Sequence, residues 1–211
     1  MRSLAIGLIA VLATSACTPI RGTDDTARNS ETVSERAQPT AVPVPEAPSE
    51  TQTYTREEIL NSAKTFFGGT TAEFAGLIER AFTDLGQPVA YIEGEEGSGA
   101  FIVGLRYGQG YLQYKGGGRG PVFWQGPSIG FDYGGNASKV FTLVYKLRKT
   151  EQLFQRFPGV EGSLYVVAGF GLNYQRSDEV VLAPIRTGVG LRAGANVGYV
   201  HYTREPSYLP F

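Results

Sequence analysis

Two consecutive stretches of the chain, residues 55–69 and 70–86, carry apolar side chains at every third or fourth position. This spacing places the apolar side chains along one side of an α-helix. Each stretch opens on a threonine followed three residues later by a glutamate, as in a capping box, and each ends on glycine. The two boxes are Thr55 with Glu58 and Thr70 with Glu73. Because the linker is so short, we expect a helical hairpin whose apolar side packs on the rest of the chain.

From residue 89 onward the apolar positions alternate with small or polar ones, which is the period of β-strands. Turn sequences such as "GEEG" at 94–97 and "YGGNAS" at 133–138 separate the alternating runs. The strands expected are 89–92, 99–107, 109–115, 121–125, 128–133, 138–148, 162–174, 179–185 and 188–203, with one short helix at about 150–157. The predicted fold class is α+β and mainly β: a small closed or strongly coiled antiparallel β-barrel of about eight strands, preceded by the helical hairpin.

Glycine gathers on one side of several predicted strands. In residues 101–115, 128–133 and 188–203 the even-numbered positions are rich in glycine, whereas the odd-numbered positions are bulky. A side that lacks Cβ atoms lets strands coil sharply, and it also lets another group approach the backbone closely. We expect sharp coiling and helix packing, with the bulky side filling the core; a ligand groove on the glycine side is the alternative.

Three charged residues, Arg106, Asp132 and Arg192, share the glycine side of their strands. If that side is covered they must pair, because an unpaired buried charge is costly. We therefore expect a structural ion-pair network. The alternative is a ligand site in which the two arginines bind an anionic headgroup.

The start of the chain has the pattern of an export signal, with Arg2, a short apolar run and then small residues. Residues 1–16 are expected to be a signal peptide, because the apolar run is too short to span a bilayer comfortably. Cys17, the only cysteine, follows "ATSA", where a bacterial lipoprotein would be acylated. We expect lipidation at Cys17 and a stable membrane anchor. Ordinary cleavage that leaves a free thiol is the alternative.

Residues 17–53 lack aromatic side chains and include a proline-rich run. Such a composition favours a disordered tether, with a partner-binding arm as the alternative. The folded domain is expected at 54–211. The protein is then periplasmic and membrane-anchored, and the inner leaflet of the outer membrane is favoured because Thr18 is not an acidic retention residue.

The residues that usually carry catalysis or bind metals are scarce. His201 is the only histidine, so the sequence offers no His/Cys metal site and no catalytic residue, and we expect no cofactor and no enzymatic activity. We expect His201 at the barrel rim, Trp124 in the core, and Glu95 and Glu96 in a solvated turn. A formal net charge of −1 gives no general attraction to nucleic acid.

Five long segments resemble the EipA family of alphaproteobacterial envelope proteins over about residues 52–211. They are "TREEILNSAKTFFGGTTAEFAGLIERAF", "GLRYGQGYLQYK", "VFWQGPSIGFDYGGNASKVFTLVYKL", "FPGVEGSLYVVAGFGLNY" and "LAPIRTGVGLRAGANVGYVHYT". The resemblance implies a soluble periplasmic domain with a small β-barrel flanked by helices, a role in envelope integrity and no known enzymatic activity. A looser similarity is to SYLF-type lipid-binding domains, through "GVGLRAGANVG". This sequence differs from the soluble form that the resemblance implies, because Cys17 after the signal peptide indicates a lipid anchor.

The sequence therefore predicts a non-enzymatic envelope protein that supports envelope integrity, with a lipid or envelope glycolipid as possible ligand and no protein partner identified. One alternative is an integral outer-membrane barrel of eight strands, since the chain ends in Phe211, although Pro206 and Pro210 interrupt its last segment. Another is an enzyme that acts on envelope polymers. Its acid and base would be Asp132 with Glu93 or Glu95.

Overall fold

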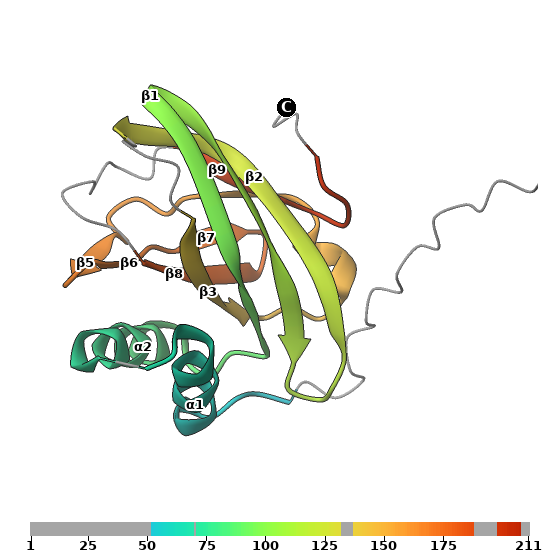
Figure 1. Ribbon diagram of the computed structural model, residues 1–211. Coiled ribbons are helices and arrows are strands. Elements are labelled where there is room, and N and C mark those ends of the chain that lie inside the picture. Colours follow the sequence, from blue (N-terminus) through green and yellow to red (C-terminus); the bar gives the residue numbers. More distant parts are fainter. Residues whose placement is uncertain (1–51, 70, 132–136, 188–197, 208–211) are drawn as a thin grey trace, which may run out of the picture. The chain divides into compact units, whose positions relative to one another are not determined.

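The computed structural model describes residues 52–69, 71–131, 137–187 and 198–207, all within the compact unit Ala41–Phe211. Two helices precede a curled antiparallel sheet of nine strands (Figure 1). This confirms the predicted fold class. No helix in the described part of the chain is both long and apolar enough to cross a membrane.

The helices are α1 (Arg56–Phe67) and α2 (Ala72–Leu85). The capping box of Thr55 and Glu58 is confirmed, and α1 ends on Gly68 in the left-handed conformation, at φ 77°. The second box is wrong by one residue. The N-cap of α2 is Thr71, whose hydroxyl accepts the backbone N–H of Phe74 at 3.3 Å. Two adjacent threonines satisfy the sequence pattern, and only the backbone geometry selects between them.

The strands follow in chain order. They are β1 (Ala90–Tyr114), β2 (Arg119–Phe131), β3 (Ser138–Tyr145), β4 (Arg156–Pro158), β5 (Tyr165–Val167), β6 (Phe170–Leu172), β7 (Gln175–Ser177), β8 (Val180–Thr187) and β9 (Tyr199–Thr203). The sheet order is β4-β9-β2-β1-β3-β8-β6-β5, and β7 also pairs with β8. A single antiparallel bridge between Gly159 and Gln175 joins the β4 end to β7 and closes the curl.

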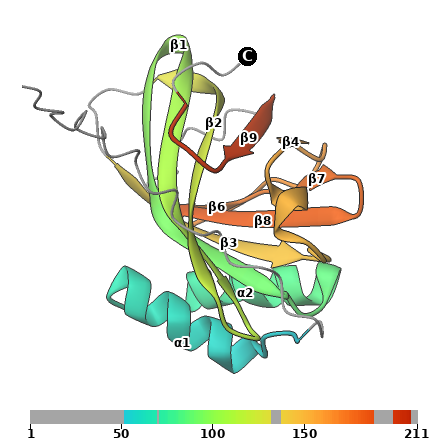
Figure 2. The ribbon, with the colours of Figure 1, turned by 90° about the vertical axis from the view of Figure 1, so that its right-hand side faces the viewer.

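Strand β1 differs most from the prediction, because its 25 residues replace three expected strands and the expected turn at 94–97. The first part of β1 pairs with β3 and the second part pairs with β2. Figure 2 shows β1 doubling back between its two halves, at the top of the view, which brings the halves near each other. The "GEEG" segment is therefore strand. Its first three residues, 94–96, pair with β3, and Gly97 continues β1.

Three further predictions need correction. The two strands expected at 121–125 and 128–133 are one continuous strand, β2. The expected helix at 150–157 is a 3-10 turn, Thr150–Leu153, and β4 begins after two further residues. The expected long strand at 162–174 is the short pair β5 and β6, separated by Ala168 and Gly169 at positive φ. Apolar residues in short runs do not distinguish these cases, because periodicity over three or four residues is ambiguous.

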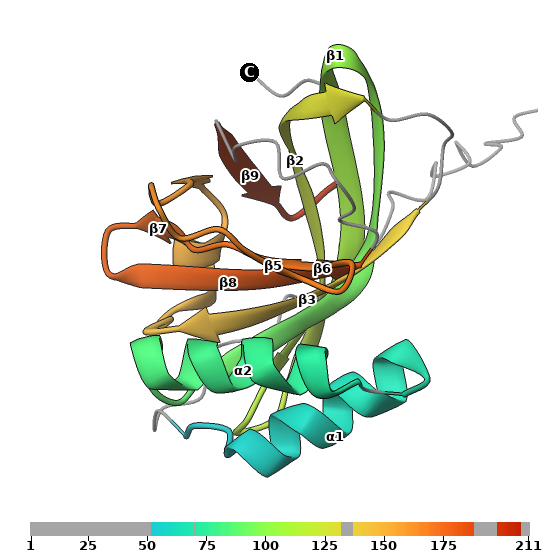
Figure 3. The same cartoon turned by 90° about the vertical axis from the view of Figure 1, so that its left-hand side faces the viewer.

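The curled sheet separates two hydrophobic cores. Residues of alternate parity along β3 and β8 serve one core or the other, as the pleat requires. The inner core fills the curl and includes Ile92, Leu112, Tyr114, Val122, Trp124, Val140, Val144, Leu182, Val200 and Tyr202. The outer core lies under the helices and includes Ile59, Phe74, Ile78, Tyr91, Phe141, Leu143 and Ile185. Figure 3 shows α1 and α2 on that side, beneath β3 and β8.

The glycine side of β1 and β2 is the inner side, and this reverses one expectation. On β1, Gly108 and Gly110 share their side with buried Leu112 and Tyr114, whereas Tyr111 is 46 % exposed on the other side. The bulky odd-numbered side was expected to fill the core. Glycine is required inside because a Cβ at Gly110 would overlap the backbone of Glu93, in the other half of the same strand.

Candidate ligand-binding site

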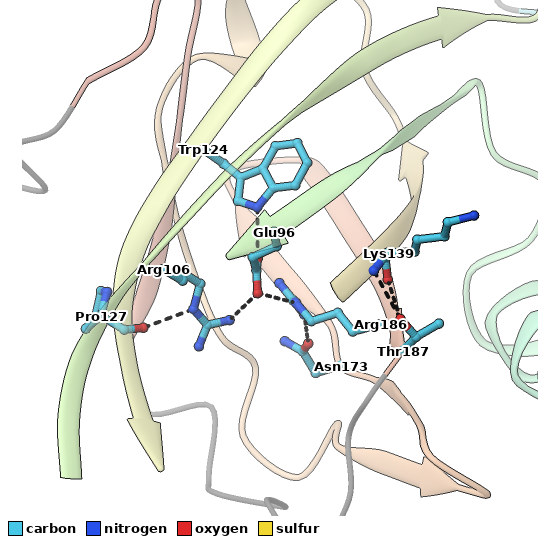
Figure 4. Close-up of polar contacts among 8 residues, drawn as sticks. All are labelled: Glu96, Arg106, Trp124, Pro127, Lys139, Asn173, Arg186 and Thr187. Atoms are coloured by element: carbon cyan, nitrogen blue, oxygen red, sulfur yellow. Dashed lines mark hydrogen bonds and ion pairs between the residues drawn. The ribbon is translucent and has the colours of Figure 1, made fainter. Parts of the chain in front are cut away.

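Trp124 is the centre of the inner face. It projects from β2 and is 3 % exposed, in agreement with the expected core position. Its indole lies against Gly108, where a Cβ would overlap the ring, so the absence of a side chain on β1 makes room for the indole. The indole N–H donates a hydrogen bond to Glu96 Oε2 at 2.8 Å. This contact places a carboxylate inside the barrel (Figure 4).

Two arginines from different strands meet that carboxylate. Arg186 on β8 donates from Nε to Glu96 Oε1 at 3.3 Å, and Arg106 Nη1 lies 3.9 Å from the same oxygen. Arg106 also donates from Nε to the carbonyl of Pro127 at 3.1 Å, and Arg186 donates from Nη1 to Asn173 Oδ1 at 2.8 Å. We call Glu96, Arg106, Arg186 and Asn173 the inner polar cluster.

The charges of the inner polar cluster control one another's ionisation. Burial alone would raise the pKa of Glu96, but Arg186, Arg106 and the Trp124 hydrogen bond outweigh it and lower that pKa. Burial, together with the nearby Arg186, lowers the pKa of Arg106 despite the attraction of Glu96. Burial also raises the pKa of the adjacent Tyr202 to about 12, so its phenol is neutral. The cluster holds two cations and one anion.

Two adjoining hollows open on β1 and β2, and Trp124 lines the first of them. One has a volume of about 280 Å³ and the other about 340 Å³, and they share Glu95, Gln109 and Phe123. Aromatic side chains line much of both. They are Tyr107, Phe123 and Trp124 in the first and Phe66, Tyr111 and Phe123 in the second. We call the two hollows together the aromatic groove.

Of the site residues predicted from sequence, Arg106 lies in the inner polar cluster, on the glycine side of its strand as expected. Asp132, Arg192 and Cys17 lie outside the described residues. The oppositely charged partner of Arg106 among the described residues is Glu96, which was expected in a solvated turn and is instead 7 % exposed. The parity of Glu96, shared with Gly94 on β1, was the signal that could have found it.

The other candidates for acid–base or metal chemistry are Glu93, Glu95 and His201. Glu93 accepts hydrogen bonds from Gln113 Nε2 at 2.7 Å and from Arg119 Nη2 at 3.3 Å. His201 lies in β9, where burial and the nearby Arg156 lower its pKa. Within the described ranges, no three His, Cys, Asp or Glu side chains gather as a metal site would need. Glu95 is exposed at the edge of the aromatic groove.

The fold and the inner polar cluster define a β-barrel-like protein with a buried charged interior. A solved structure of a beta-barrel-like, uncharacterized protein from Brucella abortus shares this fold, with a TM-score of 0.69 and 50% sequence identity. The alignment covers 75% of this chain and 99% of that chain. No curated protein matches the chain.

Residues 52–211 match the family described as Envelope integrity protein A, and the chain belongs to that family. The resemblance noted from the sequence motifs is therefore confirmed over residues 52–211. Membership supports a role associated with the cell envelope.

Proposed function

We propose that the protein is exported, held at a membrane in the periplasm by a lipid on Cys17, and supports envelope integrity without catalysis by binding a lipid or an envelope glycolipid. The inner leaflet of the outer membrane is the favoured site of anchoring. The observation that carries the proposal is the aromatic groove beside Trp124. Ligand sites are concave and lined by apolar and aromatic side chains with a few polar groups, and both hollows fit that description.

The acidic groups support a non-catalytic role. A general acid works best with a pKa near the operating pH, yet the arginines lower the pKa of Glu96. Glu93 is held by Gln113 and Arg119. These contacts are typical of structural ion pairs.

Native mass spectrometry of the full-length protein, extracted in mild detergent, tests the ligand directly. We expect a copurifying lipid mass that organic extraction removes. The Phe123→Ser variant should lose most of it, because Phe123 lines both hollows. The control is Val166→Ser on exposed β5, which should retain the lipid. A wild-type protein that carries no lipid would contradict the lipid-binding role and would favour a purely structural role in the envelope.

Metabolic labelling with a radioactive fatty acid tests the anchor. The wild-type chain should incorporate label and remain with membranes, because a triacylated cysteine binds a bilayer stably. Cys17→Ser should not incorporate label, whereas the neighbouring Thr18→Ser should behave as wild type. Equal labelling of the Cys17→Ser variant would contradict acylation at this residue.

A further inference from the structure

Two hydrogen-bond donors in the inner polar cluster lack partners. Arg186 Nη2 and Asn173 Nδ2 are fully buried and make no hydrogen bond among the described residues. Arg186 is 8 % exposed and Asn173 is 3 % exposed. A buried donor without a partner has lost its hydrogen bonds to water and gained none in return, and this loss of stability is larger for a charged group. Native proteins rarely retain two such donors side by side, so their position calls for an acceptor.

The net charge of the inner polar cluster also indicates that an acceptor, and an anionic one, binds there. Two guanidinium groups face one carboxylate, and the neighbouring Tyr202 is neutral because burial raises its pKa to about 12. The described part of the interior therefore carries one uncompensated positive charge. An uncompensated buried charge is strongly destabilising unless a counter-ion binds.

A third unpaired group, on Gln175, is an acceptor and not a donor. Gln175 pairs with Leu182 of the inner core, so its side chain shares the inner side with Asn173, two residues earlier. Its Oε1 is a buried acceptor without a hydrogen-bond partner in the described structure. A ligand that satisfies all three groups carries anionic oxygens and also a hydroxyl hydrogen.

We propose that Arg186 and Asn173 bind a phosphate group inside the barrel. An arginine presents N–H donors in a planar fork that matches phosphate oxygens, and this arginine has one arm free. A monoprotonated phosphate or a phosphate ester with a nearby hydroxyl also provides the donor for Gln175. The inference goes beyond the proposed function, because none of the residues that line the aromatic groove belongs to the inner polar cluster.

The phosphate has two possible sources, free phosphate or a lipid headgroup, and calorimetric titration of the full-length protein in non-ionic detergent separates them. The probes are inorganic phosphate, short-chain phosphatidic acid and the matching short-chain diacylglycerol, which lacks phosphate. Binding of inorganic phosphate alone indicates free phosphate. Tighter binding of phosphatidic acid indicates a lipid head. The first result supports the inference without further condition. The second supports it provided that the diacylglycerol binds at least about tenfold more weakly than phosphatidic acid, which is about 1.4 kcal/mol.

Charge-changing variants should move the affinity in opposite directions. Asn173→Asp supplies an internal anion to Arg186, so it should weaken phosphate binding at least about tenfold, or about 1.4 kcal/mol, and raise the melting temperature. Glu96→Gln removes the competing carboxylate and should strengthen binding. Asn61→Asp adds the same charge on the exposed surface of α1 and should change neither property. A purely structural cluster would not give higher stability together with lost phosphate binding.

Three results would overturn the inference. One is a wild-type protein that binds neither phosphate probe. Another is phosphate binding by the Asp132→Asn variant but not by the wild type, because Asp132 would then be the counter-ion of Arg186 in the wild-type chain. The third is equal and measurable affinity for diacylglycerol and phosphatidic acid, with no binding of inorganic phosphate. That last result would leave lipid binding by the aromatic groove intact, so the failure of this inference is distinguishable from the failure of the proposed function.

Discussion

At the scale of single residues, the interior depends on side chains that are absent as much as on those present. Gly108 leaves the space that the Trp124 indole occupies, and the indole in turn donates to Glu96. One missing Cβ thereby supports both an aromatic wall of the groove and a hydrogen bond of the polar cluster. Changes at either residue should affect both.

The Gly108→Ala variant should lower the free energy of unfolding by about 1–3 kcal/mol, because overpacking displaces the indole. Trp124 is the only tryptophan, so denaturant unfolding followed by its fluorescence reports on this site alone. The control is Gly76→Ala in α2, where a new Cβ meets nothing within 4 Å. It should raise stability by about 0.5–1 kcal/mol. An equal effect of the two alanines would contradict the packing.

The Glu96→Gln variant should lose about 3–5 kcal/mol of stability near neutral pH, because two buried guanidinium groups lose their common counter-ion. The control is Glu179→Gln, which removes an exposed pair with Arg148 and should change stability by at most about 1 kcal/mol. Urea denaturation of the three proteins measures both differences. A Glu96→Gln loss as small as that of the control would contradict a buried ion pair.

The stability difference between wild type and Glu96→Gln should depend on pH. The folded pKa of Glu96 is lowered, so its contribution is complete above the ordinary carboxyl pKa and is lost as the pH falls toward the folded value. The difference should therefore shrink below about pH 4. Urea denaturation between neutral and acidic pH measures it. A difference that grows on acidification would contradict the lowered pKa.

At the scale of elements, helix ends and strand ends are where sequence and structure differ. The stripes of α1 and α2 were predictable because they persist over 12 and 14 residues. The continuity of β1 was not predictable, because Gly94 and Gly97 are typical of turns when only their neighbours in the sequence are considered. Gly94 is explained by residues distant in the sequence, since its Cβ would overlap the backbone of Gln109 in the other half of β1 and the Trp124 indole of β2. Close approaches between distant residues leave no local signal.

The α2 cap gives a test at this scale. Thr71→Ala should lower stability by about 1 kcal/mol, because the backbone N–H of Phe74 loses its acceptor. Thr83→Ala, within the same helix, removes only a hydroxyl that donates to the Glu79 carbonyl, and it should change stability by less than about 0.5 kcal/mol. Thermal unfolding followed by circular dichroism measures both. A greater loss from Thr70→Ala than from Thr71→Ala would restore the helix start predicted from sequence.

At the scale of the folded domain, the fold class and the family were predictable, whereas the partners in the interior were not. Arg106 was identified from its parity, but its partner Glu96 and the second arginine, Arg186, come from segments about 10 and 80 residues away. Pairing of this kind depends on how the sheet curls. Curling in turn depends on strand register, which alternation alone does not specify.

Closure of the curl is the weakest part of the sheet. Strand β4 contributes three residue pairs to β9, and one bridge joins its end to β7. By contrast, 13 residue pairs join β1 and β2. Amide hydrogens of β4 should therefore exchange with solvent faster than those in the middle of the β1–β2 ladder, because short edge pairings open locally. Hydrogen–deuterium exchange read by mass spectrometry measures this, and equal protection would contradict it.

The doubled course of β1 also limits how the length of this chain can change over evolutionary time. Inner-facing residues are even-numbered before the reversal, as at Ile92 and Glu96, and after it, as at Arg106 and Leu112. Inserting or deleting one residue between the halves would exchange inside for outside along the whole second half. Arg106 would leave the interior and Gln113 would enter the hydrophobic core. Related sequences should accordingly gain or lose residues here only in pairs.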